Sequence, residues 1–234
     1  MTKPINNYYD EERMAASVAT GRHREVIGGL WEEIGAWQYD LMIAAGLQPH
    51  HRMLDVGCGT FRGGVRFVPY LEPSHYYGVD LSAALIEGGY QREMVGGGLS
   101  ERLPLANLHA TQDFDCNGFG VSFDFALAVS VFTHLPLNHI RLALHRVCEV
   151  LREGGAFVFT YFTVPADVSI VEPWLHDPGG IRTTTNSDPF HYRLSDIRHA
   201  AKELPVTIEP MPFRTHPRDQ QVLLMRRNGS STTV

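Results

Sequence analysis

The stretch MLDVGCGTFRGG, Met53 to Gly64, places an aspartate and several glycines directly after a short apolar run. An apolar run of this length that ends in glycines is typical of a buried strand. Gly57 and Gly59 would let the main chain turn tightly and approach a ligand at a point where a Cβ atom would collide. A plain strand-to-helix turn also uses glycine, so this motif alone does not establish a binding site.

Strands and helices alternate on both sides of this stretch. Apolar periodicity predicts strands at 52–57, 76–82, 107–112, 123–130, 156–162, 206–211 and 220–227, and helices at 25–45, 63–71, 83–95, 138–151 and 195–204, the last capped by Ser195. This alternation predicts an α/β fold with a doubly wound, mostly parallel, Rossmann-like sheet of about seven strands. The last two strands have no helix between them, so they should form an antiparallel hairpin.

The same pattern suggests a domain organisation. We expect an N-terminal helical cap at 1–50, a Rossmann-like domain at 51–228 and a flexible tail at 229–234. A Pro- and Gly-containing segment at 163–193, here called the lid, interrupts the domain. A long loop of this kind inside a compact domain is often a functional lid, and an irregular surface excursion is the alternative.

Composition narrows the class of protein. The net charge of −6 and the scattered basic residues give no footprint for nucleic acid. The three cysteines lack disulfide or metal-ligand spacing, and the histidines form no ligand pair, so we expect reduced thiols and no bound metal. The chain shows neither a signal-peptide core nor a membrane-spanning run, and we therefore expect a cytoplasmic protein.

Acidic residues follow the next two predicted strands. Asp80 ends the second strand, where a carboxylate can accept hydrogen bonds from both hydroxyls of a ribose, and Asp113 follows the third, near the expected place of an adenine. Together with the glycine turn they predict a nucleoside-containing ligand. A dinucleotide fits poorly because the third glycine of its fingerprint is replaced by Arg62, and because Asp55 would repel a pyrophosphate.

At these motifs the sequence resembles the class I S-adenosylmethionine-dependent methyltransferases. The resemblance rests on LDVGCGTFRGG, YYGVDLS, QDFD, FDFALAVSVFTHL and LREGGAFVFTYF, which follow the family's order together with the terminal hairpin. It implies S-adenosyl-L-methionine as the cofactor. Its binding residues would be Asp55, Gly57, Cys58, Gly59, Arg62, Asp80, Leu81, Asp113, Phe114 and Ser130. One departure is Phe61, where the family often has a third glycine, and it leaves the path of the loop open.

Histidines near the expected methyl group are candidates for a catalytic base. His134 lies just beyond the fourth strand, and His191 in the lid is the second candidate; a structural role is the alternative for both. The lid also carries aromatic residues suited to a small organic substrate. The substrate-binding candidates are Tyr9, Trp174, Phe190 and Tyr192, with Arg22 and His23 of the cap as further contacts to cofactor or substrate.

We therefore expect methyl transfer to a small molecule, at a hydroxyl group. Acceptors of other kinds stay open: an amine, a peptide or protein, or RNA, against which the acidic charge argues. A cofactor-binding partner subunit without turnover is the non-enzymatic alternative. We expect no membrane partner, and a homodimer is compatible with the sequence. Fold-level analogy cannot name the acceptor.

Overall fold

A computed structural model describes residues 6–229, so residues 1–5 and all but the first residue of the tail predicted at 229–234 lie outside the described residues. The N-terminal part contains α1 (Glu11–Ala19), α2 (His23–Val26) and α3 (Trp31–Ala44). The domain that follows contains β1 (Met53–Val56), α4 (Gly64–Tyr70), β2 (Tyr76–Asp80), α5 (Ala83–Gly89), β3 (Leu108–Ala110), β4 (Phe123–Ala128), α6 (Leu137–Val150), β5 (Leu151–Tyr161), β6 (Trp174–His176), β7 (Ile181–Thr183), α7 (Leu194–Ala200), β8 (Val206–Pro210) and β9 (Gln221–Arg227).

The main sheet has the strand order β3-β2-β1-β4-β5-β9-β8. The first five strands in this order are parallel, and β9 runs antiparallel to both β5 and β8. The predicted seven-stranded, mostly parallel sheet with a terminal hairpin is thus confirmed, and the reversed strand is β9. The strand order reverses beside β1, which is where an open α/β sheet binds its ligand.

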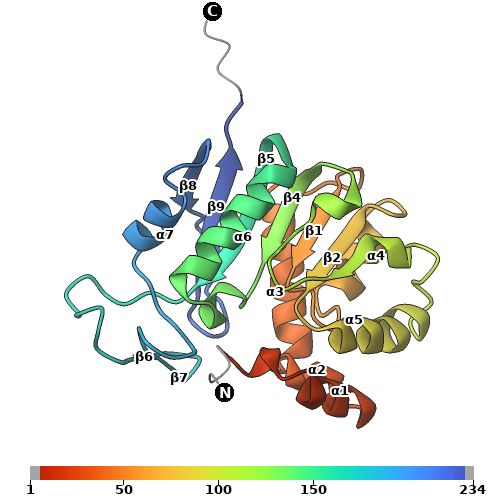
Figure 1. Cartoon of the computed structure of the whole chain (residues 1–234), viewed down its shortest axis with the longest axis horizontal. Coiled ribbons are helices and arrows are strands. Elements are labelled where there is room, and N and C mark those ends of the chain that lie inside the picture. Colours follow the sequence, from red (N-terminus) through yellow and green to blue (C-terminus); the bar gives the residue numbers. More distant parts are fainter. Residues whose placement is uncertain (1–5, 230–234) are drawn as a thin grey trace, which may run out of the picture.

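Helices cover both faces of this sheet. In Figure 1, α6 and α7 lie on the face toward the viewer, whereas α3 lies behind the strands. Side chains alternate along each strand between two cores. In β5, for example, Phe157 and Phe159 pack with the α6 and α7 side, while Ala156 and Val158 pack with the α3 and α4 side. The fold is therefore doubly wound.

Several predicted element boundaries need correction. The expected helix at 25–45 is two helices, because Gly28 and Gly29 take left-handed φ angles of 94° and 64° and break the helical path. The last helix begins at Leu194 and ends at Ala200, with Arg193 rather than Ser195 at its N-cap. The lid contains the antiparallel pair β6–β7, which was not predicted, and α1 was not predicted either.

The carboxyl ends of the parallel strands face the lower edge of the molecule in Figure 1, and α1, α2 and the β6–β7 pair lie along that edge. The N-terminal helices and the strands of the lid therefore lie along the edge of the sheet at which the strand order reverses. This arrangement positions the site described next.

Candidate active site

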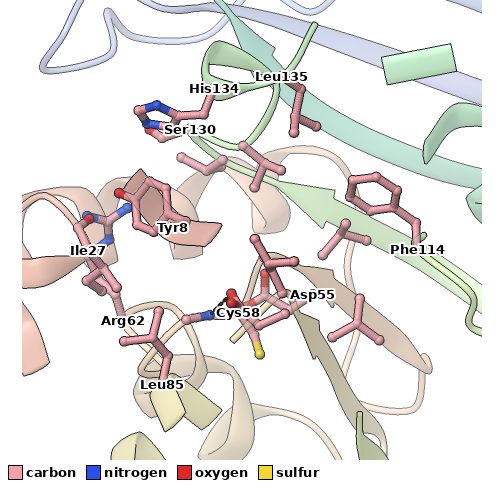
Figure 2. A pocket seen from close by; sticks show the side chains of 18 of the residues that line it. Tyr8, Ile27, Asp55, Cys58, Arg62, Leu85, Phe114, Ser130, His134 and Leu135 are labelled. Atoms are coloured by element: carbon pink, nitrogen blue, oxygen red, sulfur yellow. Dashed lines mark hydrogen bonds between the residues drawn. The ribbon is translucent and has the colours of Figure 1, made fainter. Parts of the chain in front are cut away.

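A cavity opens beyond the carboxyl ends of β1, β2 and β4. About 1040 Å³ of space, counted out to its open mouth, is free of protein atoms. Its lining comes from the cap, the turn after β1, the end of β2, residues 111, 112 and 114, the segment after β4, and Arg218. We call two parts of it by name. The glycine end comprises Asp55, Gly57, Gly59, Arg62 and Asp80. The histidine end comprises Tyr8 and His134, which line the cavity, and Asp188, which contacts His134 from outside the lining. Asp55, Arg62, Tyr8 and His134 are labelled in Figure 2.

Backbone hydrogen bonds to β2 fix the turn after β1. The N–H groups of Gly57 and Cys58 both donate to the carbonyl of Val79, at 2.8 and 3.0 Å. Gly57 has a φ of 76°, and a Cβ atom there would come within 2.4 Å of the Val131 Cγ2 atom. Glycine is required at this position for both reasons.

The conformation of Phe61 shows the path of the loop, which the sequence left open. Its φ is 69°, so the chain keeps a left-handed conformation where the family often has glycine. The ring is fully buried and packs toward Tyr76, at 6.4 Å between centroids. A left-handed non-glycine residue costs about 1 kcal/mol or more, and burial of the ring offsets that strain.

Asp55 is buried at the floor of the glycine end, as Figure 2 shows. Its Oδ2 atom accepts a hydrogen bond from the Tyr76 hydroxyl at 2.7 Å. Burial raises the pKa of this carboxyl to about 6, against the lowering effect of Tyr76. A carboxylate in this environment is stabilised by a cation placed in the cavity.

Asp80 connects the two strand ends. Its carboxylate accepts from the N–H of Gly59 at 2.8 Å and from the N–H of Ser82 at 3.0 Å. Burial raises its pKa, and the two backbone donors lower it. The side chain still borders the cavity, together with Leu81 and Cys58. Asp80 therefore has a structural role in addition to the ribose contact predicted for it.

The third strand end differs from the prediction. Asp113 is exposed, accepts from the Thr111 hydroxyl at 2.7 Å, and does not border the cavity. Phe114 does border it, and its φ of 60° turns its ring inward on the side opposite Tyr8 (Figure 2). The lining at this point consists of Thr111, Gln112 and Phe114, so the predicted role of Asp113 does not fit the geometry.

Ser130 lies at the end of β4 and borders the cavity with a φ of 60°. Its backbone N–H donates to the Thr160 hydroxyl at 2.9 Å, and its own hydroxyl exchanges hydrogen bonds with the Gln220 amide. Gln220 also accepts from Thr160 at 2.6 Å. These side chains join the ends of β4, β5 and β9 beneath the cavity.

Part of the cap covers the cavity. Asn6, Tyr8 and Tyr9 border it, and the Asn6 amide donates to the carbonyl of His134 at 2.9 Å. The helices behind these residues are anchored to the domain. Glu11 accepts from the hydroxyl of Ser82 at 2.6 Å, at the start of α5.

Arg22 and His23 of the cap, predicted as contacts, do not border the cavity. His23 is buried and its Nε2 lies 2.6 Å from Glu93 Oε1, which also accepts from Arg24. The carboxylate of Glu93 is stabilised by both partners, and these bonds hold α2 against the segment after α5. Their role in the structure is to attach the cap.

His134 belongs to the histidine end and lines the cavity there. Its Nδ1 lies 2.5 Å from Oδ1 of Asp188, and its ring meets Tyr8 edge-on with centroids 5.2 Å apart. None of the described residues hydrogen-bonds Nε2. Because a carboxylate only accepts hydrogen bonds, it favours the tautomer with hydrogen on Nδ1 and a free electron pair on Nε2.

The site residues predicted in the lid do not border the cavity. His191 is fully buried, and both ring nitrogens are engaged, Nδ1 with the Thr183 hydroxyl at 2.7 Å and Nε2 with the Ile170 carbonyl at 2.8 Å. It therefore cannot serve as the base in this arrangement. Phe190 and Tyr192 belong to the core beside α6, and Trp174 lies on β6.

His191 is part of a longer series of polar contacts, here called the lid chain. His176 continues it, with Nε2 at 2.9 Å from the Thr183 hydroxyl and Nδ1 at 3.2 Å from Asp219 Oδ2. His176 lies on β6 opposite Ile181, and its side chain reaches diagonally to Thr183 on β7. The lid chain thus ties this pair of strands to the loop before β9.

Sequence reasoning missed Asn6, Tyr8, Gln38, Asp188 and Arg218. Four of them border the cavity, and Asp188 orients His134. They come from segments far from the glycine turn, and no short motif marks them. The one available signal was the aromatic pair in NNYYDEER, of which Tyr9 alone was selected.

With this geometry established, the chain was compared with known proteins. Residues 54–157 match the family model described as a methyltransferase domain. Residues 54–157, less than half of the chain, therefore form a methyltransferase domain. The matched residues run from β1 into β5 and include the whole glycine end.

Solved methyltransferases share the fold of this domain. Magnesium protoporphyrin IX methyltransferase from Synechocystis PCC 6803, crystallised with its cofactor, has 13% identity and a TM-score of 0.57 over 97% of this chain and 87% of that one. An O-methyltransferase family protein from Burkholderia thailandensis has 14% identity and a TM-score of 0.67 over 96% and 64%. A methyltransferase from Clostridium acetobutylicum ATCC 824 has 14% identity and a TM-score of 0.63 over 92% and 99%.

The groups present in the methyltransferase cavity fit S-adenosylmethionine. Arg62 is only 6% exposed, and its Nε has no hydrogen-bond partner among the described residues. The Oε1 atom of Gln38, buried beside it, has none either. A buried donor and a buried acceptor without partners match the carboxylate and ammonium of a methionyl group, and Asp55 adds a carboxylate for the positive end.

Two further features concern the described part of the chain. Between residues 6 and 229, no helix combines the length and the apolar character needed to cross a membrane. The same residues include no group of three or more His, Cys, Asp or Glu side chains arranged to hold a metal ion.

Proposed function

We propose that this methyltransferase acts on a hydroxyl group of a small molecule. The observation that carries the proposal is the pair formed by His134 and Asp188, 2.5 Å apart at the histidine end. A hydroxyl acceptor must lose its proton during transfer, whereas an amine needs no protein base. A histidine that is oriented by a carboxylate and has a free Nε2 is suited to remove that proton.

Other residues in and around the cavity orient His134 and bind the cofactor. Asp188 keeps the proton of His134 on Nδ1, so Nε2 can accept a proton from the acceptor. Asp80 accepts hydrogen bonds from the ribose, Asp55 faces the positive charge, and Arg62 holds the methionyl carboxylate. When bound, S-adenosylmethionine supplies an activated methyl group on a sulfonium. Correct orientation of the reacting groups can contribute on the order of 7–11 kcal/mol.

The covered cavity supports a small acceptor. Asn6, Tyr8 and Tyr9 border the same cavity as the glycine turn and restrict access to it from the side of the cap. The hydrogen bond from Asn6 to the carbonyl of His134 fixes this cover next to the proposed base. A folded protein surface could reach His134 only after displacement of these residues.

The proposal is tested with pairs of acceptors that differ in one group, phenols and the corresponding anilines. We expect cofactor-dependent products that gain one methylene in mass, from the phenols but not from the anilines. The sequence-based alternatives supply the contrary outcomes. Methylation of the anilines alone, or of peptides with no small molecule as substrate, would contradict the assignment.

A further inference from the structure

Two guanidinium groups border one cavity without a carboxylate partner. Arg62 and Arg218 both contribute to the lining, and neither forms an ion pair with any described aspartate or glutamate. Arg62 is nearly fully buried, and Arg218 is half-buried. Charged side chains in such positions are normally paired. Asp55 and Asp80 of the same lining balance the two positive charges in number, but neither arginine has a carboxylate within ion-pair distance, so both can still bind a ligand anion.

The two cations act on each other and on a neighbouring histidine. Burial and the charge of Arg218 lower the pKa of Arg62 to about 10. Burial and the charges of both arginines lower the pKa of His216 to about 3, so this histidine is neutral at physiological pH. Like charges held this close are relieved by an anion that binds between or beside them.

Arg218 is fixed in place by three segments. Its guanidinium donates to the carbonyl of Gly28 in the cap, and its backbone N–H donates to Nδ1 of His216 at 3.0 Å. The lid packs directly on it, because a Cβ atom on Gly179 would lie 2.6 Å from the Cα of Arg218. The main chain of Arg218 is thus fixed by the lid and by His216, and its guanidinium by the bond to Gly28.

The two arginines come from different segments of the chain, and their guanidinium groups meet at the cap loop 27–29, where Arg62 donates to Ile27 and Gly29 and Arg218 donates to Gly28. Arg62 belongs to the glycine turn. Arg218 precedes β9, two residues before Gln220, which bonds to Ser130 at the end of β4. The hydroxyl of Tyr8 lies where the charges of Arg62, Arg218 and Asp188 all affect its pKa, which burial raises. Tyr8, His134 and Arg218 all line the same cavity.

The cofactor has one carboxylate, and Arg62 lies beside Asp55 to receive it. We propose that Arg218 binds an oxyanion of the acceptor, a carboxylate or a phosphate, while the acceptor's hydroxyl faces His134. The substrate class is then a hydroxylated acid. This inference rests on the proposed function, since it places the acceptor in the same cavity. Guanidinium groups bind both oxyanions in a bidentate manner.

The experiment compares hydroxybenzoates with their neutral amides and with hydroxyphenyl phosphates, as ligands and as substrates. Binding is measured by calorimetry on the protein saturated with S-adenosylhomocysteine, so it does not depend on turnover. The wild type should bind one class of anion at least about tenfold more tightly than the amide, the contribution expected from a charge-assisted bond. The better anion identifies the oxyanion.

Variants separate the roles of the two arginines. Arg218→Met should remove the preference for the anion, leave amide binding unchanged and alter cofactor affinity by less than about twofold. Arg218→Lys, which keeps the charge, should retain part of the preference and guards against loss of folding. Arg62→Met is the matched control: it should weaken cofactor binding and retain the preference.

Two outcomes would overturn the inference. One is a wild type that binds neither anion better than the amide, whether or not it methylates them. The other is an Arg218→Met protein that loses cofactor affinity as Arg62→Met does but keeps the preference for the anion. If anions bind through Arg218 while no hydroxyl is methylated, the anion site stands and only the proposed function fails.

Discussion

The glycine end of the cavity comes from one short piece of chain, residues 55–80, whereas the histidine end is assembled from distant segments. At the glycine end, backbone groups of neighbouring strands bond to each other, as Gly57 does to Val79. At the histidine end, the hydrogen bond from Asn6 to His134 spans 128 residues and the pair of His134 with Asp188 spans 54. The first is fixed by local geometry and the second by the packing of cap and lid. Substitutions should therefore separate binding from turnover.

The largest effect is expected at the histidine end. His134→Ala should lower turnover by about a hundredfold or more, because it removes the proposed base. Cofactor affinity should not change, since the glycine end is intact. Turnover of the variant and the wild type is measured side by side, at saturating cofactor and acceptor, together with cofactor binding by calorimetry.

His199→Ala, at an exposed position on α7, serves as the matched control and should retain the wild-type rate. If His134→Ala instead melts at a lower temperature but keeps turnover per folded molecule, His134 has a structural role. The histidine end would then have no demonstrated role in catalysis.

Asp80→Ala should weaken cofactor binding by at least about tenfold, through loss of charge-assisted hydrogen bonds to the ribose. From sequence alone, the melting temperature would be expected to change little. The structure predicts a decrease as well, because the N–H groups of Gly59 and Ser82 lose their acceptor. Calorimetry and thermal melting measure the two effects. An unchanged dissociation constant would show that Asp80 only supports the turn.

Asp55 predicts a dependence on pH. Its pKa is raised from 3.8 to about 6 by burial, so the folded protein binds more protons than the unfolded chain between these values. Stability should therefore fall as pH rises from about 4 to 6, by about 3 kcal/mol in total. Asp55→Asn should remove this slope in melts recorded across that range.

The same carboxyl should couple pH to cofactor binding. A cation in the cavity favours the ionised form, so affinity should increase up to about pH 6, by at most about tenfold per unit, and then level off. Calorimetry in buffers of different ionisation enthalpy should detect proton release on binding at pH 5. Binding with no proton release would place the cation away from Asp55.

The smallest effect is expected at the third strand end. Asp113→Ala should change cofactor affinity by less than about twofold, as is usual for an exposed residue outside a site. Phe114→Ala is the comparison, because Phe114 borders the cavity and should weaken binding more. A loss at Asp113 equal to that at Phe114 would restore the sequence-based assignment.

The difference between the two ends also explains what could be predicted from the sequence. The sheet, its terminal hairpin and the glycine end follow from periodicity and from one local motif, and they were predicted. Which side chain points into the cavity after a strand depends on single φ angles, such as the 60° of Phe114. The sequence does not show these angles, so it predicted Asp113 as a cofactor contact although Asp113 does not border the cavity. Tyr8 and Arg218 reach the cavity, and Asp188 reaches His134, only through long-range packing, for which no local pattern exists.

The hydrogen atoms of the lid chain can be counted. The chain has contacts from Asp219 to His176, from His176 to Thr183, from Thr183 to His191 and from His191 to the carbonyl of Ile170. Both ends only accept, and each neutral member between them donates one hydrogen. The three members therefore supply one hydrogen fewer than the contacts require, unless an imidazole is protonated.

Burial lowers the pKa of His176 and opposes that protonation. While both imidazoles are neutral, the series is one hydrogen short. A change of imidazole tautomer together with a rotation of the Thr183 hydroxyl moves the gap from one contact to the next. A single arrangement of heavy atoms therefore comprises several arrangements of protons, and β6 and β7 are joined to the loop before β9 by hydrogen-bond patterns that can interconvert.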